Sequence, residues 1–460
     1  MLWTSQQLNA ALNLRQITCS EIGVHGVSID SRTISRGDLF IALDGKSGKP
    51  FQGNVANARN GHEFIRSAES NGAAAVICSQ KIKCKIPSFL VNDTLDALWD
   101  LAKFSRDRMN GEVLAITGSA GKTTTRVWLE QLLQAQGRTH ASVASYNNHW
   151  GVPLSLSRMP SEADYGIFEV GMNHRGEIAP LSILVRPKVA LVVNVLPAHI
   201  GHLGTLDAIR REKLDISKGL VSGGTLVLPF DLDQTGVAKD LNILTFGLSA
   251  EADISGKIIK RNDPWLLEVK ADQERFELTL QSGGEHLAKT ALATLAAVYA
   301  LGGELHTAVQ DIDKLGLPPG RGNLLNALGR CIIDDSYNAN VVSMQYAIDN
   351  LGRKPCGKKI ALLGEMRELG DHGPLMHHEV LESCKKLDAV LTVGRAFCNS
   401  EEILGTKLLQ HADSAGDIDL DRLAEYTDPG DTILVKGSNA IFWRHQFVDR
   451  LVSAIKNRQT

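Results

Sequence analysis

The stretch Leu114–Thr125, LAITGSAGKTTT, carries the strongest structural signal in the chain. Its apolar start predicts a buried strand, and its two glycines permit a tight turn before the helical pattern that begins at Lys122. A strand, a glycine loop and a helix starting with Lys-Thr form a phosphate cradle: N–H groups face the oxygens, the lysine adds positive charge, and a threonine hydroxyl can reach magnesium. The stretch therefore predicts a nucleotide-binding loop.

This loop is a variant of the usual phosphate-loop pattern, because the first glycine of that pattern would fall at Ile116. A glycine-rich turn that binds no ligand is the alternative, and the strand and helix around the loop favour nucleotide binding. The candidate nucleotide-binding residues are Thr117, Gly118, Ser119, Ala120, Gly121, Lys122, Thr123 and Thr124.

Length, charge and cysteine content bound the class of protein. The 460 residues suggest about three domains, and the net charge of −3 argues against a general binder of nucleic acid or anionic membranes. Seven dispersed cysteines predict reduced thiols. The start of the chain lacks a signal-peptide pattern, and no apolar run reaches the roughly 18 residues of a membrane helix. We expect a soluble cytoplasmic monomer with no nucleic-acid partner and no integral membrane segment.

The order of predicted strands and helices indicates an α/β fold with three domains. The central domain is expected to hold a parallel sheet around the phosphate loop, and the C-terminal domain is expected to be Rossmann-like without a phosphate loop of its own. The expected ranges are 1–107 for a smaller mixed α/β domain, 108–316 for the central domain and 317–460 for the C-terminal domain.

The central domain alternates continuous apolar strands with helices, which predicts a mostly parallel sheet covered on both faces. Residues 265–269 and 275–280 alternate apolar and polar side chains and are expected to form an antiparallel edge. Residues 106–111 are an expected linker into this domain, and the Pro- and Gly-rich residues 318–322 mark its end.

Polar residues just beyond the central strands are candidates for chemistry, because ligands in open α/β sheets lie at the carboxyl ends of strands. Glu169 is placed to be an oxygen ligand for magnesium beside the nucleotide. Its alternative role is a structural ion pair. His199 follows the next strand, and an ordinary hydrogen-bonded polar residue is the alternative there.

Two further stretches have competing interpretations. Lys213 lies in the charged segment Ile209–Asp215, whose pattern by itself predicts a solvated helix face with local ion pairs. Asn147 and Asn148 precede a Gly-Val-Pro turn, where their amides either bind a ligand or cap the next helix.

Three polar clusters follow strands of the C-terminal domain, at residues 334–340, 364–370 and 436–439. Turn formation explains each cluster singly. Three of them at one sheet edge predict a cleft wall that faces the nucleotide-binding domain.

Taken together, these motifs resemble the Mur ligases, the ATP-dependent amide-forming enzymes of peptidoglycan synthesis. The resemblance covers all three domains. It rests on Ser28–Thr33, Thr117–Thr124, Asn147–Pro153, Glu169–Ile178, Ala198-His199, Lys213, Asp335–Asn340, Gly364–Gly370 and Lys436–Ser438.

The resemblance implies a role for each matching residue. It implies that Lys122 and its loop hold the ATP phosphates, that Thr123 and Glu169 serve a first Mg²⁺, and that His199 serves a second. Lys213 matches a lysine that family members carbamylate, which contradicts the solvated-face interpretation. The resemblance assigns the UDP-sugar end to Ser31 and Arg32, further substrate contacts to Asn147 and Asn148, and ATP contacts or domain closure to Arg321, Asn338 and Asn340.

Within the family, the chain resembles the members that add D-alanyl-D-alanine to UDP-N-acetylmuramoyl-tripeptide through an acyl phosphate. The motif of the diaminopimelate-adding members is absent. Several positions depart from the family pattern: Gly201 replaces an acid, Thr290 replaces an amide on the adenine side, Glu365 replaces Asp, and Asn439 replaces Arg. The alternatives are another amide ligase, such as a folylpolyglutamate synthetase, and a nucleotide-binding switch or motor ATPase without ligase activity.

Overall fold

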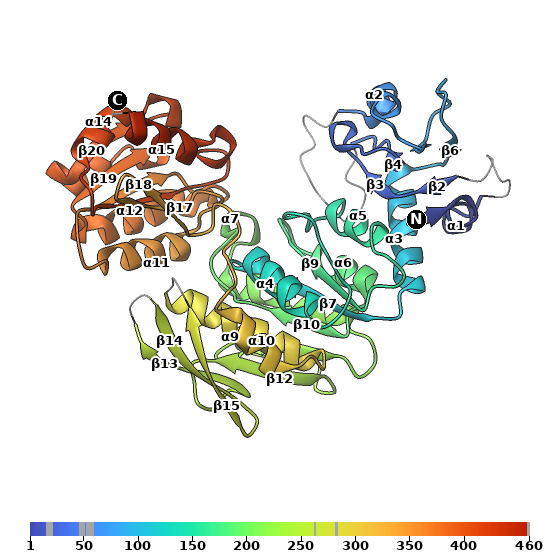
Figure 1. The fold of residues 1–460 in the computed structure, drawn as a ribbon, viewed down its shortest axis with the longest axis horizontal. Coiled ribbons are helices and arrows are strands. Elements are labelled where there is room, and N and C mark those ends of the chain that lie inside the picture. Colours follow the sequence, from blue (N-terminus) through green and yellow to red (C-terminus); the bar gives the residue numbers. More distant parts are fainter. Residues whose placement is uncertain (15–21, 46–50, 52–58, 262–263, 281–283, 458–460) are drawn as a thin grey trace.

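The computed structural model describes residues 1–14, 22–45, 51, 59–261, 264–280 and 284–457, which form three α/β bodies (Figure 1). The N-terminal body, blue in Figure 1, has a parallel sheet in the order β3-β4-β5-β6 and an antiparallel pair of β1 with β2. Its elements are β1 (Trp3–Thr4), α1 (Ser5–Ala11), β2 (Gly23–Val24), β3 (Gly26–Ser28), β4 (Asp38–Ile41), α2 (Ile65–Ser70), β5 (Ala75–Cys78), β6 (Ser88–Leu90) and α3 (Thr94–Arg108).

Helix α3 joins the N-terminal body to the central one and corrects the expected linker at 106–111. The helix begins with Asp93, whose carboxylate accepts the N–H groups of Leu95 and Asp96, and it continues to Arg108. The Arg106 guanidinium donates to the carbonyl oxygens of Val185 and Arg186 at 2.8 and 2.9 Å. This end of α3 is therefore anchored on the central body by its arginine, which a charged, loop-like pattern does not predict.

The central body is built on a nine-stranded sheet in the order β15-β14-β13-β12-β11-β10-β7-β9-β8. All neighbours are parallel except β13-β14 and β14-β15, so the predicted parallel sheet with an antiparallel edge is confirmed. Its strands are β7 (Glu112–Thr117), β8 (Thr139–Ala141), β9 (Tyr165–Glu169), β10 (Val189–Val192), β11 (Thr225–Pro229), β12 (Asn242–Gly247), β13 (Ile254–Lys260), β14 (Trp265–Ala271) and β15 (Glu274–Leu280).

Helices cover both faces of this sheet, as the alternation of side chains along β7 illustrates. Leu114 and Ile116 pack into the core on the side of α4 and α9, whereas Val113 and Ala115 pack into the opposite core with α5 and α6. Each fully buried Leu or Ile contributes roughly 1.5–3 kcal/mol to folding. The helices are α4 (Lys122–Gln134), α5 (Gly151–Ser157), α6 (Ile178–Val185), α7 (Ile200–Leu203), α8 (Leu206–Leu214), α9 (Glu285–Ala300) and α10 (Leu305–Ile312).

The C-terminal body, orange and red in Figure 1, has a six-stranded sheet in the order β16-β17-β21-β18-β19-β20. Only the β16-β17 pair is antiparallel, which agrees with the predicted Rossmann-like domain. Its elements are β16 (Asn323–Ala327), β17 (Arg330–Asp335), α11 (Val341–Gly352), β18 (Lys359–Gly364), α12 (Gly373–Ser383), β19 (Ala389–Val393), α13 (Ser400–Leu404), β20 (Leu408–Ala412), α14 (Leu420–Tyr426), β21 (Thr432–Lys436) and α15 (Phe447–Asn457).

Strand register brings the candidate residues to two sheet edges. In the central sheet, Glu169 pairs with Ile116 and Val192 pairs with Thr117, so the phosphate loop starts beside the ends of β9 and β10. In the C-terminal sheet, Lys436 pairs with both Asp335 and Leu363. The three polar clusters of that body therefore share one edge, as predicted.

Two further features of the described residues bear on the class of protein. Six cysteines are free thiols, and Cys19 lies outside the described residues. Within the same part of the chain, each helix is too short or too polar to cross a bilayer. The domain boundaries at 107 and 316 stay predictions.

Candidate active site

The phosphate loop joins β7 to α4 through a left-handed turn. Gly121 has φ of +79° and lies at the N-cap of α4, a conformation that favours glycine. In the described part of the chain, the N–H groups of Lys122, Thr123 and Thr124 have no protein acceptor. These N–H groups, with the positive end of the helix, can receive an anion.

Lys122 lies folded back on the loop. Its ammonium donates to the carbonyl oxygen of Gly118 at 2.6 Å, and burial lowers its pKa, opposed by the nearby negative charge of Glu169. The charge on Lys122 is thus held within the loop, beside the start of α4, where a phosphate group would lie.

Asn194 braces the loop from the end of β10. Its Oδ1 accepts the N–H groups of Ser119 and Ala120 at 3.0 and 2.9 Å, and its Nδ2 donates to the Ala120 carbonyl at 3.0 Å. The sequence predicts that loop N–H groups face phosphate, but these two are directed at Asn194. The N–H groups available to a phosphate are those of the helix start.

Glu169 combines both of the roles that the sequence leaves open. One carboxylate oxygen lies 3.1 Å from Arg126 Nε in a buried ion pair, and the other accepts the Thr123 hydroxyl at 3.3 Å. The side chain of Glu169 is 0% exposed. Mg²⁺ prefers oxygen ligands and usually keeps only one or two protein carboxylates, so Thr123 and Glu169 fit the donor set of that ion.

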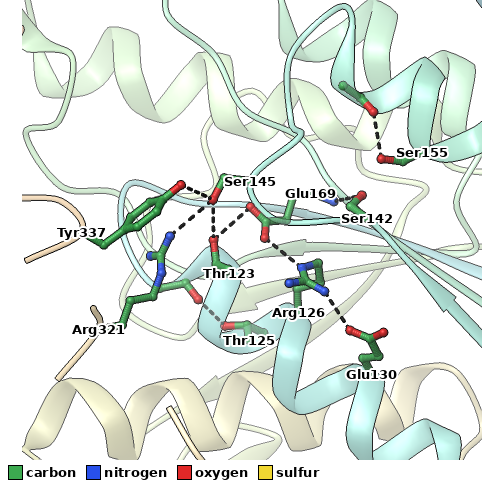
Figure 2. A network of polar contacts seen from close by, with 12 residues as sticks. Thr123, Thr125, Arg126, Glu130, Ser142, Ser145, Ser155, Glu169, Arg321 and Tyr337 are labelled. Carbon is green, nitrogen blue, oxygen red and sulfur yellow. Dashed lines mark hydrogen bonds and ion pairs between the residues drawn. The ribbon is translucent and has the colours of Figure 1, made fainter. Parts of the chain in front are cut away.

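Ser145 lies at the centre of a polar network that the sequence does not indicate (Figure 2). Its hydroxyl is 3.3 Å from the Thr123 hydroxyl, 3.1 Å from the Tyr337 hydroxyl and 3.4 Å from Arg321 Nη2. The Arg321 guanidinium also lies over the Tyr337 ring, 4.3 Å from its centroid. Arg321 and Tyr337 belong to the C-terminal body, so this network crosses the boundary between the two bodies.

Lys213 is buried in α8, contrary to the solvated face that its charge pattern predicts. The residue is 2% exposed, and neither a hydrogen bond nor an ion pair engages its ammonium among the described residues. Burial lowers its pKa well below the usual value, Lys122 lowers it further, and Glu212 opposes the shift. The pattern fails because Glu212 also turns inward, where it accepts the N–H groups of Gly176 and Ile178 at 2.8 and 3.0 Å.

His199 contacts the C-terminal body. Its Nδ1 lies 2.5 Å from Glu368 Oε2, although the two atoms are not aligned as a hydrogen bond. This contact lowers the pKa of the Glu368 carboxyl, against the opposing effect of burial. Gly201 lies against the same loop: a Cβ atom added to it would come 2.6 Å from the Gly370 N. The acid expected from the family pattern at position 201 would not fit in this arrangement.

A cleft of about 950 Å³ lies between the central and C-terminal bodies. Most of the predicted nucleotide and metal residues line it, whereas Thr117, Gly118, Glu169 and Lys213 are not among its lining residues. Predicted site residues on its wall are Ser119, Ala120, Gly121, Lys122, Thr123, Thr124, Asn147, Asn148, His199, Arg321, Asn338 and Asn340.

Ser31 and Arg32 lie elsewhere, in the N-terminal body. Ser31 is buried, whereas the Arg32 side chain is 86% exposed and pairs with Asp30 at 2.7 Å. The structure does not bring these two residues into the cleft.

Several asparagines of the cleft wall hold the backbone. Asn148 Oδ1 accepts the N–H of Gly151 at 2.9 Å at the start of α5, as the capping alternative predicts. Asn340 forms a capping box with Ser343 at the start of α11. At Asn338 it is the backbone carbonyl oxygen that accepts a hydrogen bond, from the Lys436 ammonium at 3.2 Å.

The far end of the cleft contains Thr290 and His286. The Thr290 hydroxyl donates to the His286 carbonyl at 2.9 Å, so it is used within α9. The His286 ring stacks on Tyr346 of α11 at 5.7 Å and 25°. Although the residue is exposed at the cleft, desolvation of its ring by the surrounding protein, helped by the positive charge of Lys436, lowers the pKa of His286 to about 4.

Three family descriptions match successive parts of this chain. "Mur ligase family, catalytic domain" matches residues 23–103, "Mur ligase middle domain" matches 116–298, and "Mur ligase, glutamate ligase domain" matches 320–439. The chain therefore belongs to the Mur ligase family, and the resemblance inferred from its motifs is confirmed.

Within the family, two similar curated relatives share one name. A UDP-N-acetylmuramoyl-tripeptide--D-alanyl-D-alanine ligase from Escherichia coli is 31% identical, with 85% of this chain and 86% of the relative aligned. A ligase of the same name from Rickettsia prowazekii is 29% identical over 96% of this chain and 98% of the relative.

Solved structures give the same result for the fold. A crystal structure of MurF from Acinetobacter baumannii has a TM-score of 0.85, 30% identity, and coverage of 98% of this chain and 99% of that one. MurF from Thermotoga maritima in complex with ADP has a TM-score of 0.80, 29% identity, and coverage of 95% and 99%.

Proposed function

We propose that this protein is an ATP-dependent ligase that adds D-alanyl-D-alanine to UDP-N-acetylmuramoyl-tripeptide, the reaction named for its MurF relatives. The observation that carries the proposal is the cleft in which the phosphate loop faces Arg321 and Tyr337 of the C-terminal body. Relatives with this name align along almost the whole chain, and one such structure holds ADP.

The reaction takes two steps. A carboxylate oxygen of the tripeptide attacks the γ-phosphorus of ATP, ADP leaves, and an acyl phosphate forms. The amine nitrogen of D-alanyl-D-alanine then attacks the carbonyl carbon, inorganic phosphate leaves, and the nitrogen loses a proton. Because the first step brings a carboxylate to a triphosphate, Lys122 and the free N–H groups of α4 act by positioning the reactants and neutralising charge.

Magnesium supplies charge neutralisation for the phosphate groups, and Thr123 and Glu169 are the residues that would hold it. Both offer oxygen atoms that lie 3.3 Å apart at the loop. For a second Mg²⁺ we propose His199, which lines the same cleft.

Lys213 is proposed to act as a carbamate. A neutral lysine amine adds to carbon dioxide, forming an N–C bond and releasing one proton, and the product carries a negative charge. The burial of Lys213, its lowered pKa and the positive charge of Lys122 favour this change from cation to anion.

The remaining substrate contacts follow from the family motifs. We propose that Ser31 and Arg32 of the N-terminal body meet the UDP-sugar end, that Asn147 and Asn148 meet the substrate near the phosphate loop, and that Asn338 and Asn340 meet ATP. We also propose that the protein acts as a monomer, because a single chain provides both walls of the cleft. A cytoplasmic location is part of the same proposal.

Phosphate release from ATP tests the function. With UDP-N-acetylmuramoyl-tripeptide present, release should require D-alanyl-D-alanine, and single amino acids should not replace it. Release with only a different acceptor would indicate another amide ligase. Release without any acceptor would indicate an ATPase.

A further inference from the structure

Ser145 lies in the segment between β8 and α5, where it is half-buried beside the phosphate loop. Figure 2 shows its hydroxyl between the Thr123 side chain and two side chains of the C-terminal body. The three distances from Ser145 Oγ are 3.1 Å to Tyr337, 3.3 Å to Thr123 and 3.4 Å to Arg321. The hydroxyl is therefore a single atom that contacts both walls of the cleft.

The direction of each hydrogen bond follows from what each group can donate. The Glu169 carboxylate only accepts, so the Thr123 hydroxyl gives its proton to Glu169. The Ser145 hydroxyl must then donate to Thr123. Arg321 can only donate, and the Tyr337 hydroxyl donates as well, so both give protons to Ser145.

Ser145 thus makes one donated and two accepted hydrogen bonds, which is the full capacity of a hydroxyl group. All three bonds are longer than the usual ranges for O–H···O and N–H···O hydrogen bonds, so each is weak alone. Aligned in one direction, they polarise one another and link the C-terminal body to Thr123 and Glu169.

We propose that Ser145 is a positioning residue that couples the placement of the C-terminal body to the orientation of Thr123 on the phosphate loop. The contacts from Arg321 and Tyr337 exist only when the C-terminal body lies against the central one. Thr123 then has its hydroxyl fixed toward Glu169, and the loop is set for phosphoryl transfer only in this arrangement. The inference rests on the proposed ligase function for its kinetic readout alone.

Kinetics of three full-length variants test the coupling: Ser145→Ala, Tyr337→Phe and the double variant. We expect Ser145→Ala to lower kcat about tenfold and to change the KM for ATP by less than about twofold. If Tyr337 acts through Ser145, the double variant loses no more activity than Ser145→Ala. Ser145→Thr keeps a hydroxyl and should restore most of the rate.

A matched control comes from helix α5, which follows the Ser145 segment. The Ser155 hydroxyl is buried and donates to the Gly151 carbonyl at 2.8 Å, away from the C-terminal body. Ser155→Ala should leave kcat close to that of the unaltered protein. A loss equal to that of Ser145→Ala would overturn the coupling role.

Small-angle X-ray scattering of the ligand-free protein gives a readout that does not depend on the reaction. The radius of gyration should increase in Ser145→Ala, return in Ser145→Thr and stay unchanged in Ser155→Ala. Tyr337→Phe provides the same test if Ser145→Ala does not fold. Unchanged scattering in both Ser145→Ala and Tyr337→Phe would overturn the inference. Losses of kcat that multiply in the double variant would also overturn it, whatever substrate the protein ligates.

Discussion

His199 of the central body and Glu368 of the C-terminal body meet at 2.5 Å, and both have left-handed backbones, with φ of 59° and 64°. Non-glycine residues adopt this conformation rarely, and a group of contacts is needed to hold it. Here the conformation directs the His199 and Glu368 side chains at each other across the boundary between the bodies. The contact between His199 and Glu368 joins the two bodies at one place. The contacts of Ser145 with Arg321 and Tyr337 join them at a second place, beside the phosphate loop.

Gly201→Ala should separate the two bodies at this contact. The added Cβ would lie 2.6 Å from the Gly370 N and 2.9 Å from the Glu368 carbonyl oxygen, so the C-terminal body must shift. We expect kcat to fall by about tenfold to a hundredfold, because small displacements of reacting groups are costly, while ADP affinity measured by calorimetry changes little. Gly416→Ala is the control, since its added Cβ meets only the Ser414 hydroxyl at 3.6 Å. Equal rates in both variants would contradict the prediction.

Glu169→Gln should weaken the affinity of the site for magnesium. The variant loses one charged oxygen ligand, so the magnesium concentration for half-maximal phosphate release should rise about tenfold. It also leaves Arg126 without its buried partner, and the melting temperature should fall. Glu130→Gln separates the two effects, because Glu130 pairs with Arg126 at 2.8 Å without contacting Thr123. A magnesium response shared by both variants would assign the effect to Arg126.

Lys213→Ala should abolish most activity, and short carboxylates in the buffer should restore part of it. The expected loss is at least about a hundredfold, since the site loses a proposed anion near the phosphate loop. Lys218→Ala removes an exposed lysine just beyond the same helix and should have little effect. Full activity in Lys213→Ala, without a response to carboxylates, would exclude the carbamate. Labelled carbon dioxide should give a carbamate carbon signal in the unaltered protein only.

His286 should make folding sensitive to acid. Its pKa falls from 6.5 to about 4 in the folded protein, so the unfolded chain binds more protons between these values. The free energy of unfolding should therefore decrease as the pH drops through this window, by less than the full shift implies because the His286 side chain is exposed to solvent, and it should be independent of this group above about pH 6.5. Urea unfolding at neutral pH and at about pH 4.5 measures the change.

Two variants assign that change to its source. His286→Gln should lose much of the acid sensitivity, and His25→Gln, in the N-terminal body, should keep it. An unchanged pH dependence in His286→Gln would refute the assignment.

Much of the fold follows from local patterns in the sequence. The strand before the phosphate loop, the helix after it and the antiparallel edge are confirmed, because each depends on the spacing of apolar side chains over a few residues. The placement of polar residues at the carboxyl ends of strands also predicts the cleft, since Glu169 ends β9 and Asp335 ends β17.

The contacts that depend on distant segments could not be predicted in this way. Asn194 and Ser145 look like ordinary loop residues, and their partners lie at least 22 positions away in the chain. The charged segment around Lys213 has the composition of a solvated helix, but tertiary packing turns three of its charged residues inward. Only the family resemblance, and not the periodicity, pointed to Lys213.

The bracing of the phosphate loop by Asn194 has a consequence for how nucleotide binds. Because three hydrogen bonds from one side chain already hold Ser119 and Ala120, the conformational entropy of this loop is lost when the chain folds and not when the ligand arrives. Binding energy from the phosphate contacts then appears more fully as affinity. The phosphate loop is therefore preorganised for nucleotide binding, and we expect the conformational change that accompanies the reaction to be a movement of the C-terminal body.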